Sequence, residues 1–201
     1  MKFLNINFRD ILKLYVNQVG ITIFALMLYT ACGAVGDFVL LSKLRTIVSV
    51  FSICFYFVLL YFVVWEIGAK DKIRIDGGKM QKSPAKGALL ALFANIPNFI
   101  LSILSLIFGW ISISGGSNFF ANAFGFLQLA TMTHASMYMG LIQTMVYGFT
   151  TVDKVPIDSR YMTMPLLFVL LPIISILVCH IAYSLGNKDK KILSIFSSKN
   201  K

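Results

Sequence analysis

The sequence has few charged residues, and this scarcity decides its class. Asp, Glu, Lys and Arg make up only 13% of the 201 residues, whereas soluble globular domains carry roughly a quarter. The mean hydropathy of +0.81 is correspondingly high. Such a composition excludes an ordinary soluble domain and predicts a protein that lies in a membrane.

Acidic residues are scarcer still, with eight Asp and Glu against 18 Lys and Arg and a formal net charge of +10. An excess of this size raises the question of nucleic-acid binding. Every Lys and Arg, however, lies in a short connection or tail beside a charge-free stretch. That is the positive-inside pattern of membrane topology and not a basic face for nucleic-acid phosphates. We therefore expect anionic lipid headgroups, and no nucleic acid, as partners of these charges.

Cysteines and histidines are too few and too scattered for a cofactor site. Cys32, Cys54 and Cys179 all lie in apolar segments, where they are typical of small buried side chains and not of disulfides or metal ligands. The sequence also lacks HExxH and GxSxG motifs and has no paired carboxylates inside its apolar stretches. It predicts no catalytic, cofactor-binding or metal-binding residues.

Long charge-free stretches are what the sequence does contain, at 14–36, 46–65, 87–152 and 161–187. Each reaches or exceeds the roughly 20 residues that a helix needs to cross a bilayer. We expect a single all-α polytopic membrane domain over residues 1–201, with five, or alternatively six, transmembrane helices. The predicted membrane helices are 19–41, 46–66, 84–112, 118–149 and 164–186.

Three shorter segments complete the predicted organisation. Residues 1–18 place Leu4 and Phe8 on one helical face and Arg9 and Asp10 on the other, which predicts an amphipathic helix in the membrane interface. Residues 67–83 are predicted to form a basic cytoplasmic loop, and residues 187–201 a basic tail. With the N-terminus in the cytoplasm, the charge distribution predicts a multi-pass protein of the cell membrane.

The stretch 118–149 permits two interpretations. A line of mostly small or polar residues at helical spacing favours one helix of roughly 48 Å, longer than the roughly 30 Å hydrocarbon core. Positive charges favour a break near His134 and two crossings. With two crossings, 14 Lys and Arg lie inside and 4 outside; with one, the counts are 11 and 7. Both interpretations are kept as predictions.

Small and polar residues form a polar seam along the third predicted helix, at steps of three and four residues. Its members are Ala88, Ala91, Asn95, Asn98, Ser102, Ser105, Gly109 and Ser112. In lipid, such residues let helix backbones approach and form hydrogen bonds. A looser line in 118–149 is the expected partner, packed antiparallel with Ser105 close to Gly125. The predicted packing residues are Ser102, Ser105, Gly109, Gly125, Thr133, Ser136 and Gly140.

Six positive charges lie in and beside the predicted loop: Lys70, Lys72, Arg74, Lys79, Lys82 and Lys86. Residues 72–80 alternate around Asp76–Gly77, which is a β-hairpin signal. The charges are expected to anchor the loop to anionic headgroups, each contributing about 1 kcal/mol. The alternative is a docking loop for a cytoplasmic partner such as an ATPase.

Five polar residues near or within the membrane are candidates for function. His134 lies midway along 118–149, and an ionisable residue inside a membrane is a functional hypothesis by default. Its alternative role is a neutral hydrogen bond between helices. Asp37 lies near the end of the first predicted crossing. Asn95, Asn98 and Gln143 would line a water-accessible cavity if the chain were a carrier.

Three functions follow as expectations. The first is a non-enzymatic subunit of a transporter or membrane assembly, with another membrane subunit or a cytoplasmic ATPase as partner. The second is a stand-alone small-molecule or ion carrier or channel, and the third is a lipid-acting membrane enzyme using His134 or Asp37. Residues 65–98, 171–172 and 182–186 resemble small bacterial multi-spanning proteins of unassigned function. The resemblance implies a bacterial inner membrane and transfers no functional residues.

Overall fold

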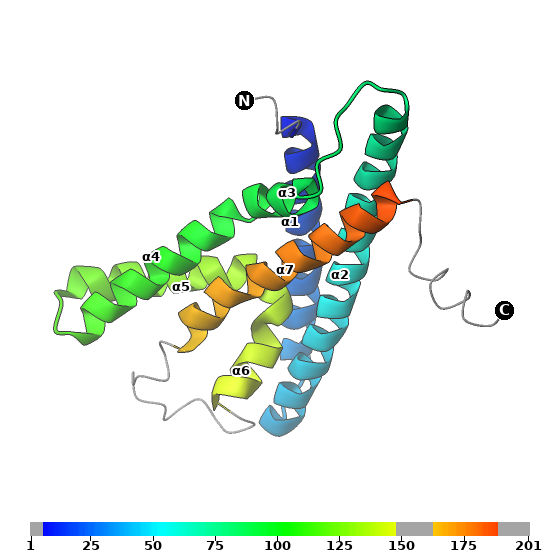
Figure 1. Ribbon diagram of the computed structural model, residues 1–201. Helices are drawn as coiled ribbons and strands as arrows, with labels where there is room; N and C mark the ends of the chain where they lie inside the picture. Colours follow the sequence, from blue (N-terminus) through cyan, green and yellow to red (C-terminus); the bar gives the residue numbers. More distant parts are fainter. Residues whose placement is uncertain (1–5, 148–162, 189–201) are drawn as a thin grey trace. The chain divides into compact units, whose positions relative to one another are not determined.

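The computed structural model describes residues 6–147 and 163–188, and every regular element in these ranges is helical (Figure 1). The elements are α1 (Phe8–Ala31), the 3₁₀ turn η1 (Cys32–Ala34), α2 (Phe38–Asp76), α3 (Lys86–Ala94), α4 (Ile96–Ile113), α5 (Asn118–His134), the 3₁₀ turn η2 (Ser136–Tyr138), α6 (Met139–Tyr147) and α7 (Thr163–Asn187). The predicted all-helical class is confirmed.

Four helical stretches in the described residues are long and apolar enough to cross a membrane. They are Phe8–Ala34, Val39–Asp76, Ile96–Ile113 and Thr163–Asn187. These four stretches are consistent with a membrane protein. The predicted last helix, 164–186, agrees closely with the observed bounds of α7.

The chain divides into two compact units. Unit 1 contains Met1–Asn17, Phe57–Asn95 and Ile173–Lys201, and unit 2 contains Gln18–Tyr56 and Ile96–Pro172. Helices α1, α2 and α7 therefore contribute residues to both units. Each unit is described by itself below.

Helices α1 and α2 run antiparallel, and the connection between them lies earlier than predicted. In unit 2, the Gln18 amide donates a hydrogen bond to the Tyr56 hydroxyl at 3.2 Å, which fixes the pairing. The sequence places the turn at 42–45, but the structure places it at 35–37. The reason is helix capping, because the Asp37 carboxylate accepts a bond from the Val39 amide at 2.9 Å and begins α2 there.

Helix α2 continues to Asp76, so the predicted β-hairpin over 72–80 is wrong. Lys70, Lys72 and Arg74 lie on the helix and not in a loop. The helix ends because Gly78 adopts a φ of 68° and the Lys79 amide donates to the Arg74 carbonyl at 2.9 Å. This glycine-terminated helix end outweighs the alternation that suggested strands. At the N-terminal end of the chain, α1 is continuous from Phe8. It is not divided at residue 18, where the amphipathic helix is predicted to end.

The third predicted helix is broken at Asn95, between α3 and α4. Pro97 has no backbone N–H to donate to an earlier carbonyl, so it is accommodated in the first turn of α4. The Asn95 side chain donates to the Ala91 carbonyl at 2.8 Å and closes the end of α3. The break thus lies two residues before Pro97.

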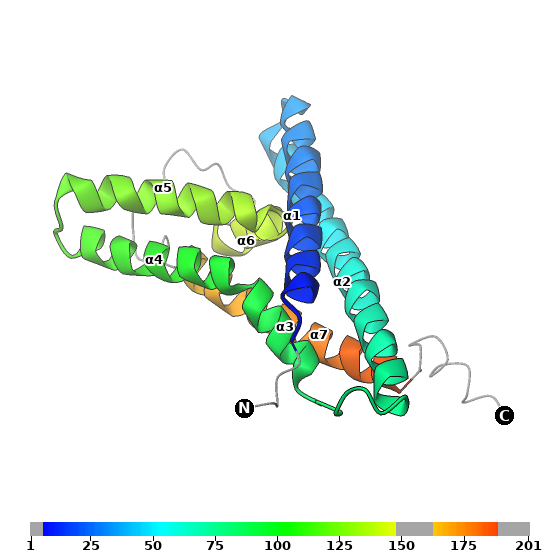
Figure 2. The same cartoon turned by 90° about the horizontal axis from the view of Figure 1, so that it is seen from above.

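Helices α4 and α5 lie side by side in unit 2 (Figures 1 and 2). On α4, the predicted packing residues Ser102, Ser105 and Gly109 are all buried. On α5, the buried residues are Phe124, Gln128 and Thr131, whereas Gly125 and Thr133 are exposed. The expectation that Gly125 and Thr133 belong to the packed face of α5 is therefore wrong. The Ser105 hydroxyl instead donates to the Gln128 amide oxygen at 2.9 Å, which turns a different face of α5 towards α4.

The stretch 118–149 is not one helix, because it breaks after His134. Side chains from elsewhere in unit 2 bind the backbone on both sides of the break. The Thr22 hydroxyl donates to the His134 carbonyl at 3.0 Å, and the Ser136 hydroxyl donates to the Thr22 carbonyl at 2.8 Å. The Gly140 amide donates to the Ser49 hydroxyl at 2.8 Å. The bonds to the His134 carbonyl and from the Gly140 amide satisfy backbone groups that a broken helix would otherwise leave unpaired.

Candidate functional site

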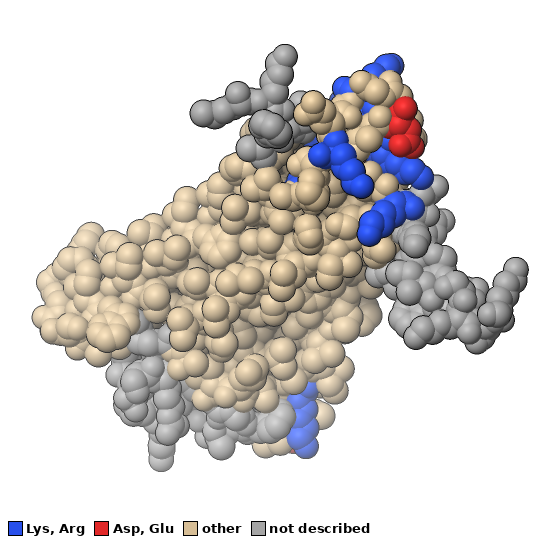
Figure 3. All heavy atoms as spheres, viewed as in Figure 1, with Lys and Arg blue, Asp and Glu red and all other residues tan. Residues whose placement is uncertain are grey.

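The end of α2 in unit 1 carries a dense group of charges. Helix α2 has 39 residues and is therefore about 58 Å long, well beyond the roughly 30 Å hydrocarbon core. Its charge-free middle, 46–65, is followed by Glu66, Lys70, Asp71, Lys72, Arg74 and Asp76. Figure 3 shows Lys, Arg, Asp and Glu side chains gathered over this end of α2 and its adjoining loop.

Three of the side chains in unit 1 form a buried charge cluster, which consists of Asp71, Lys86 and Tyr183. The Lys86 ammonium donates to Asp71 Oδ2 at 2.6 Å, and the Tyr183 hydroxyl donates to the same oxygen at 2.9 Å. Asp71 and Lys86 are only 1% and 2% exposed. The Arg74 guanidinium approaches the other carboxylate oxygen, Oδ1, at 3.8 Å. The cluster joins α2, α3 and α7.

Small residues allow the three helices to approach closely enough for this cluster. A Cβ atom on Gly87 of α3 would collide with the Tyr183 side chain and the Cys179 carbonyl of α7. A Cβ on Gly68 of α2 would collide with the Tyr183 carbonyl. Cys179 and Ala182 are themselves fully buried on α7. Close backbone approach through small residues is the usual form of helix packing in lipid.

A second, more exposed set of charges joins α1 to α2 in unit 1. The Glu66 carboxylate accepts a bond from Lys13 at 2.9 Å and from Lys70 at 2.6 Å. All three side chains are about half exposed, and ion pairs of this kind contribute about 0–1 kcal/mol each. Their main effect is to hold the start of α1 beside the charged end of α2.

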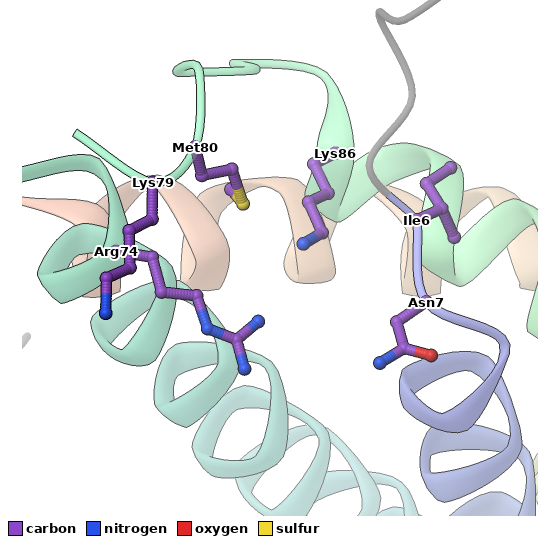
Figure 4. A pocket seen from close by; sticks show the side chains of 6 residues that line it. All are labelled: Ile6, Asn7, Arg74, Lys79, Met80 and Lys86. Carbon is purple, nitrogen blue, oxygen red and sulfur yellow. The ribbon is translucent and has the colours of Figure 1, made fainter. Parts of the chain in front are cut away.

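Two pockets lined by described residues lie at this charged end. The first has a volume of about 510 Å³ and is lined by Ile6, Asn7, Arg74, Lys79, Met80 and Lys86 (Figure 4). The second, of about 500 Å³, is lined by Asn7, Arg9, Asp10, Lys13, Ile67, Lys70, Asp71 and Arg74. Asn7 and Arg74 line both pockets. Positive side chains outnumber negative ones in each.

Several predicted loop residues therefore belong to a folded site. Lys70, Arg74, Lys79 and Lys86 line the pockets, but Lys86 is not the exposed lipid anchor that the sequence suggests, because it is paired with Asp71. Lys82 is exposed and lies outside the lining of both pockets, and Lys72 is half-buried.

Sequence reasoning missed Asp71 and Tyr183. A signal for Asp71 exists on α2, where buried residues recur at helical spacing. The line runs through Tyr56, Leu60, Val64, Ile67 and Asp71, each at most 5% exposed. Extending the apolar face of α2 beyond the charge-free stretch would have placed Asp71 in the interior.

The other sequence candidates are engaged in structural bonds. Asp37 begins α2 as described above, and the carbonyl of His134 accepts the bond from Thr22. The Gln143 amide oxygen accepts a 2.6 Å bond from the Tyr29 hydroxyl. Asn95 belongs to unit 1, whereas His134, Gln143 and the half-buried Asn98 belong to unit 2.

Within residues 6–147 and 163–188, no group of three or more His, Cys, Asp or Glu is arranged to hold a metal ion. Comparison of the chain with protein-family models, curated proteins and solved structures finds no match. The basic pockets and the buried charge cluster are the most distinctive features of the described residues of unit 1.

Proposed function

We propose that this chain is a multi-pass membrane protein that serves as a non-enzymatic subunit of a larger membrane assembly, such as a transporter. The charged end of α2 in unit 1 is the surface that meets an anionic partner. The observation that carries this proposal is the buried charge cluster, which holds Lys86 and Arg74 beside the two pockets. A buried ion pair contributes little net stability compared with apolar packing, which favours a role in positioning these side chains.

The bonds of the intramembrane polar residues support a subunit over a carrier. A carrier needs polar groups that line a water-accessible path. Ser105, Gln128 and Gln143 are instead bonded to side chains of neighbouring helices. Such bonds are typical of packing between membrane helices.

The topology that fits this function has the N-terminus and the charged end of α2 in the cytoplasm of a bacterial cell, at the inner membrane. The first turns of α1, from Phe8 to residue 18, form the amphipathic segment at the membrane interface. Helices α1, α2, α4 and α7 cross the bilayer, and α5 with α6 adds a fifth crossing or a fifth and sixth. Because α5 ends at His134 and three Lys directly follow α7 in the sequence, we favour an arrangement that returns the basic tail to the cytoplasm.

A reporter that is active only in the cytoplasm, fused after Lys201, tests this topology. We expect it to be active, because Lys188, Lys190 and Lys191 directly follow α7 and positive charges favour the cytoplasmic side. A fusion at Gly36, in the connection between α1 and α2, is the internal control and should be inactive. An inactive reporter after Lys201 would instead mean a single crossing by 118–149.

Detergent extraction of the tagged chain from native membranes, followed by mass spectrometry, tests the subunit proposal. We expect a stoichiometric partner, lost on Lys79→Glu because the charge reversal repels an anionic surface. Lys43→Glu, an exposed change in the first turns of α2, is the matched control and should retain the partner. A chain that purifies alone from native membranes contradicts the proposal.

The break between α5 and α6 favours a second candidate function, a stand-alone carrier. Discontinuous helices near the middle of a membrane form binding sites in many transporters. Uptake of solute into vesicles that contain only this purified chain would distinguish the carrier from the subunit.

A further inference from the structure

We propose that the first pocket, lined by Arg74, Lys79 and Lys86, binds the phosphate group of an anionic ligand. The ligand is a phosphate monoester, carried either by a lipid headgroup or by a small soluble compound. This inference deepens the proposed function and rests on it only in assigning the charged end of unit 1 to ligand contact.

The charges that line this pocket fit an anion. Arg74, Lys79 and Lys86 contribute three cations, Asn7 contributes an amide, and the described lining residues include no Asp or Glu. In Figure 4 the Arg74 guanidinium and the Lys86 ammonium point into the space from different sides, with Asn7 on a further wall. Arg74 and Lys86 therefore converge on this space, whereas the Lys79 ammonium points away from Lys86 and Asn7 in this view.

The contacts with Asp71 leave donors available for a ligand. The Lys86 ammonium is bonded to Asp71 and its side chain is only 2% exposed, so Lys86 contributes positive charge to the pocket wall. The Arg74 guanidinium has five donors and only approaches Asp71, at 3.8 Å. Its planar fork suits bidentate binding of phosphate oxygens. Among the described residues, no carboxylate lies at ion-pair distance from Lys79.

The buried charge cluster prepares the site before a ligand arrives. Tyr183 and Lys86 both bind the same oxygen of Asp71, so the Lys86 side chain is held in one orientation. Ordering a long flexible side chain on binding lowers the affinity, and prior ordering removes much of that cost. Asp71 and Tyr183 thus act as positioning residues for the phosphate site.

The size of the pocket and its height above the hydrocarbon core favour a phosphate monoester over the phosphodiester of an ordinary phospholipid. Its 510 Å³ volume leaves room for more than a phosphate, and the adjoining second pocket shares Asn7 and Arg74 with it. The charge-free stretch of α2 ends at Trp65, which marks the edge of the hydrocarbon core. Arg74 lies nine residues later, about 14 Å further along the helix axis. The headgroup layer extends only about 5–8 Å beyond the hydrocarbon core. A phosphate at the tip of an extended headgroup, or on a soluble compound, can reach that height.

The test uses the purified full chain in phosphatidylcholine nanodiscs. The soluble arm titrates glycerol 3-phosphate, and the lipid arm compares nanodiscs that contain phosphatidylinositol 4-phosphate with nanodiscs of equal surface charge that contain phosphatidylglycerol. Native mass spectrometry and thermal shift measure binding. We expect one bound phosphate monoester per chain, with affinity lowered about tenfold or more by Arg74→Gln or Lys79→Gln.

Lys82→Gln is the matched control, since Lys82 is exposed and does not line the pocket, and it should change affinity less than about twofold. Binding in the soluble arm assigns a soluble ester, and binding in the lipid arm alone assigns a headgroup. Either result supports the site. Equal binding of phosphatidylglycerol, an equal loss on Lys82→Gln, or no binding by folded protein overturns it. Retention of a co-purified partner in that case shows that the proposed function stands and only the phosphate site fails.

Discussion

Replacing Lys86 with Met is expected to lower the free energy of unfolding by about 3–5 kcal/mol, because it removes the cation bonded to the buried Asp71 carboxylate and leaves only the Arg74 guanidinium, 3.8 Å away. Asp71 is 1% exposed, so water cannot take the place of the ammonium. The remaining Tyr183 hydroxyl supplies a single hydrogen bond to the charge. Denaturant titration of the full chain in mixed micelles would measure the loss.

The double variant Asp71→Leu with Lys86→Met is the informative companion to this experiment. It removes both charges and should recover most of the stability, because apolar side chains of similar volume often replace a buried pair without cost. Lys82→Met, at an exposed position, should change the free energy of unfolding by less than about 0.5 kcal/mol. A Lys86→Met loss no larger than that of Lys82→Met would mean that the pair is not buried.

Replacing Gly140 with Ala is expected to destabilise unit 2 by about 1–3 kcal/mol, since the added methyl group overfills a closed contact. The new Cβ would collide with the Arg45 carbonyl and crowd the Ser49 hydroxyl. It would also disturb the bond from the Gly140 amide to Ser49, which begins α6. The free energy of unfolding in the same micelles is the measurement.

Gly125 provides the control for this substitution. It is also a helical glycine, and among the described residues no atom outside its own helix backbone and chain neighbours lies within 4 Å of a Cβ added there. Gly125→Ala should therefore be neutral or stabilise the protein by up to about 1 kcal/mol through helix propensity. Equal effects of the two substitutions would show that α6 does not pack against α2 at Arg45.

Much of the fold could be predicted from hydropathy, because long charge-free stretches have few alternatives to helices in lipid. The bounds of α7 and the buried small residues of α4 follow from this local pattern. The break after His134 does not, since it depends on the bond that Thr22 donates to His134 and the bond that Ser49 accepts from Gly140, and both partners are distant in sequence. The turn at 35–37 depends on Asp37 acting as a helix cap rather than as an intramembrane acid.

Only the cationic residues of the candidate site could be predicted from the sequence. Lys70, Arg74, Lys79 and Lys86 are recognisable as a basic group from sequence alone, but their assignment to a loop hides the partners that arrange them. Asp71 becomes significant only once α2 is known to continue to Asp76. Tyr183 contributes through packing of α7 against Gly68 and Gly87, and that contact between distant segments leaves no local pattern.

The hydrogen bonds at the α5–α6 break have a mechanical consequence. Thr22 donates its hydroxyl to His134 and accepts the Ser136 hydroxyl at its carbonyl, so one residue binds both sides of the bend. The two bonds tie the backbone before the bend and the side chain after it to the same residue of α1. Thr22 therefore opposes straightening of α5 into α6 from both sides of Ala135.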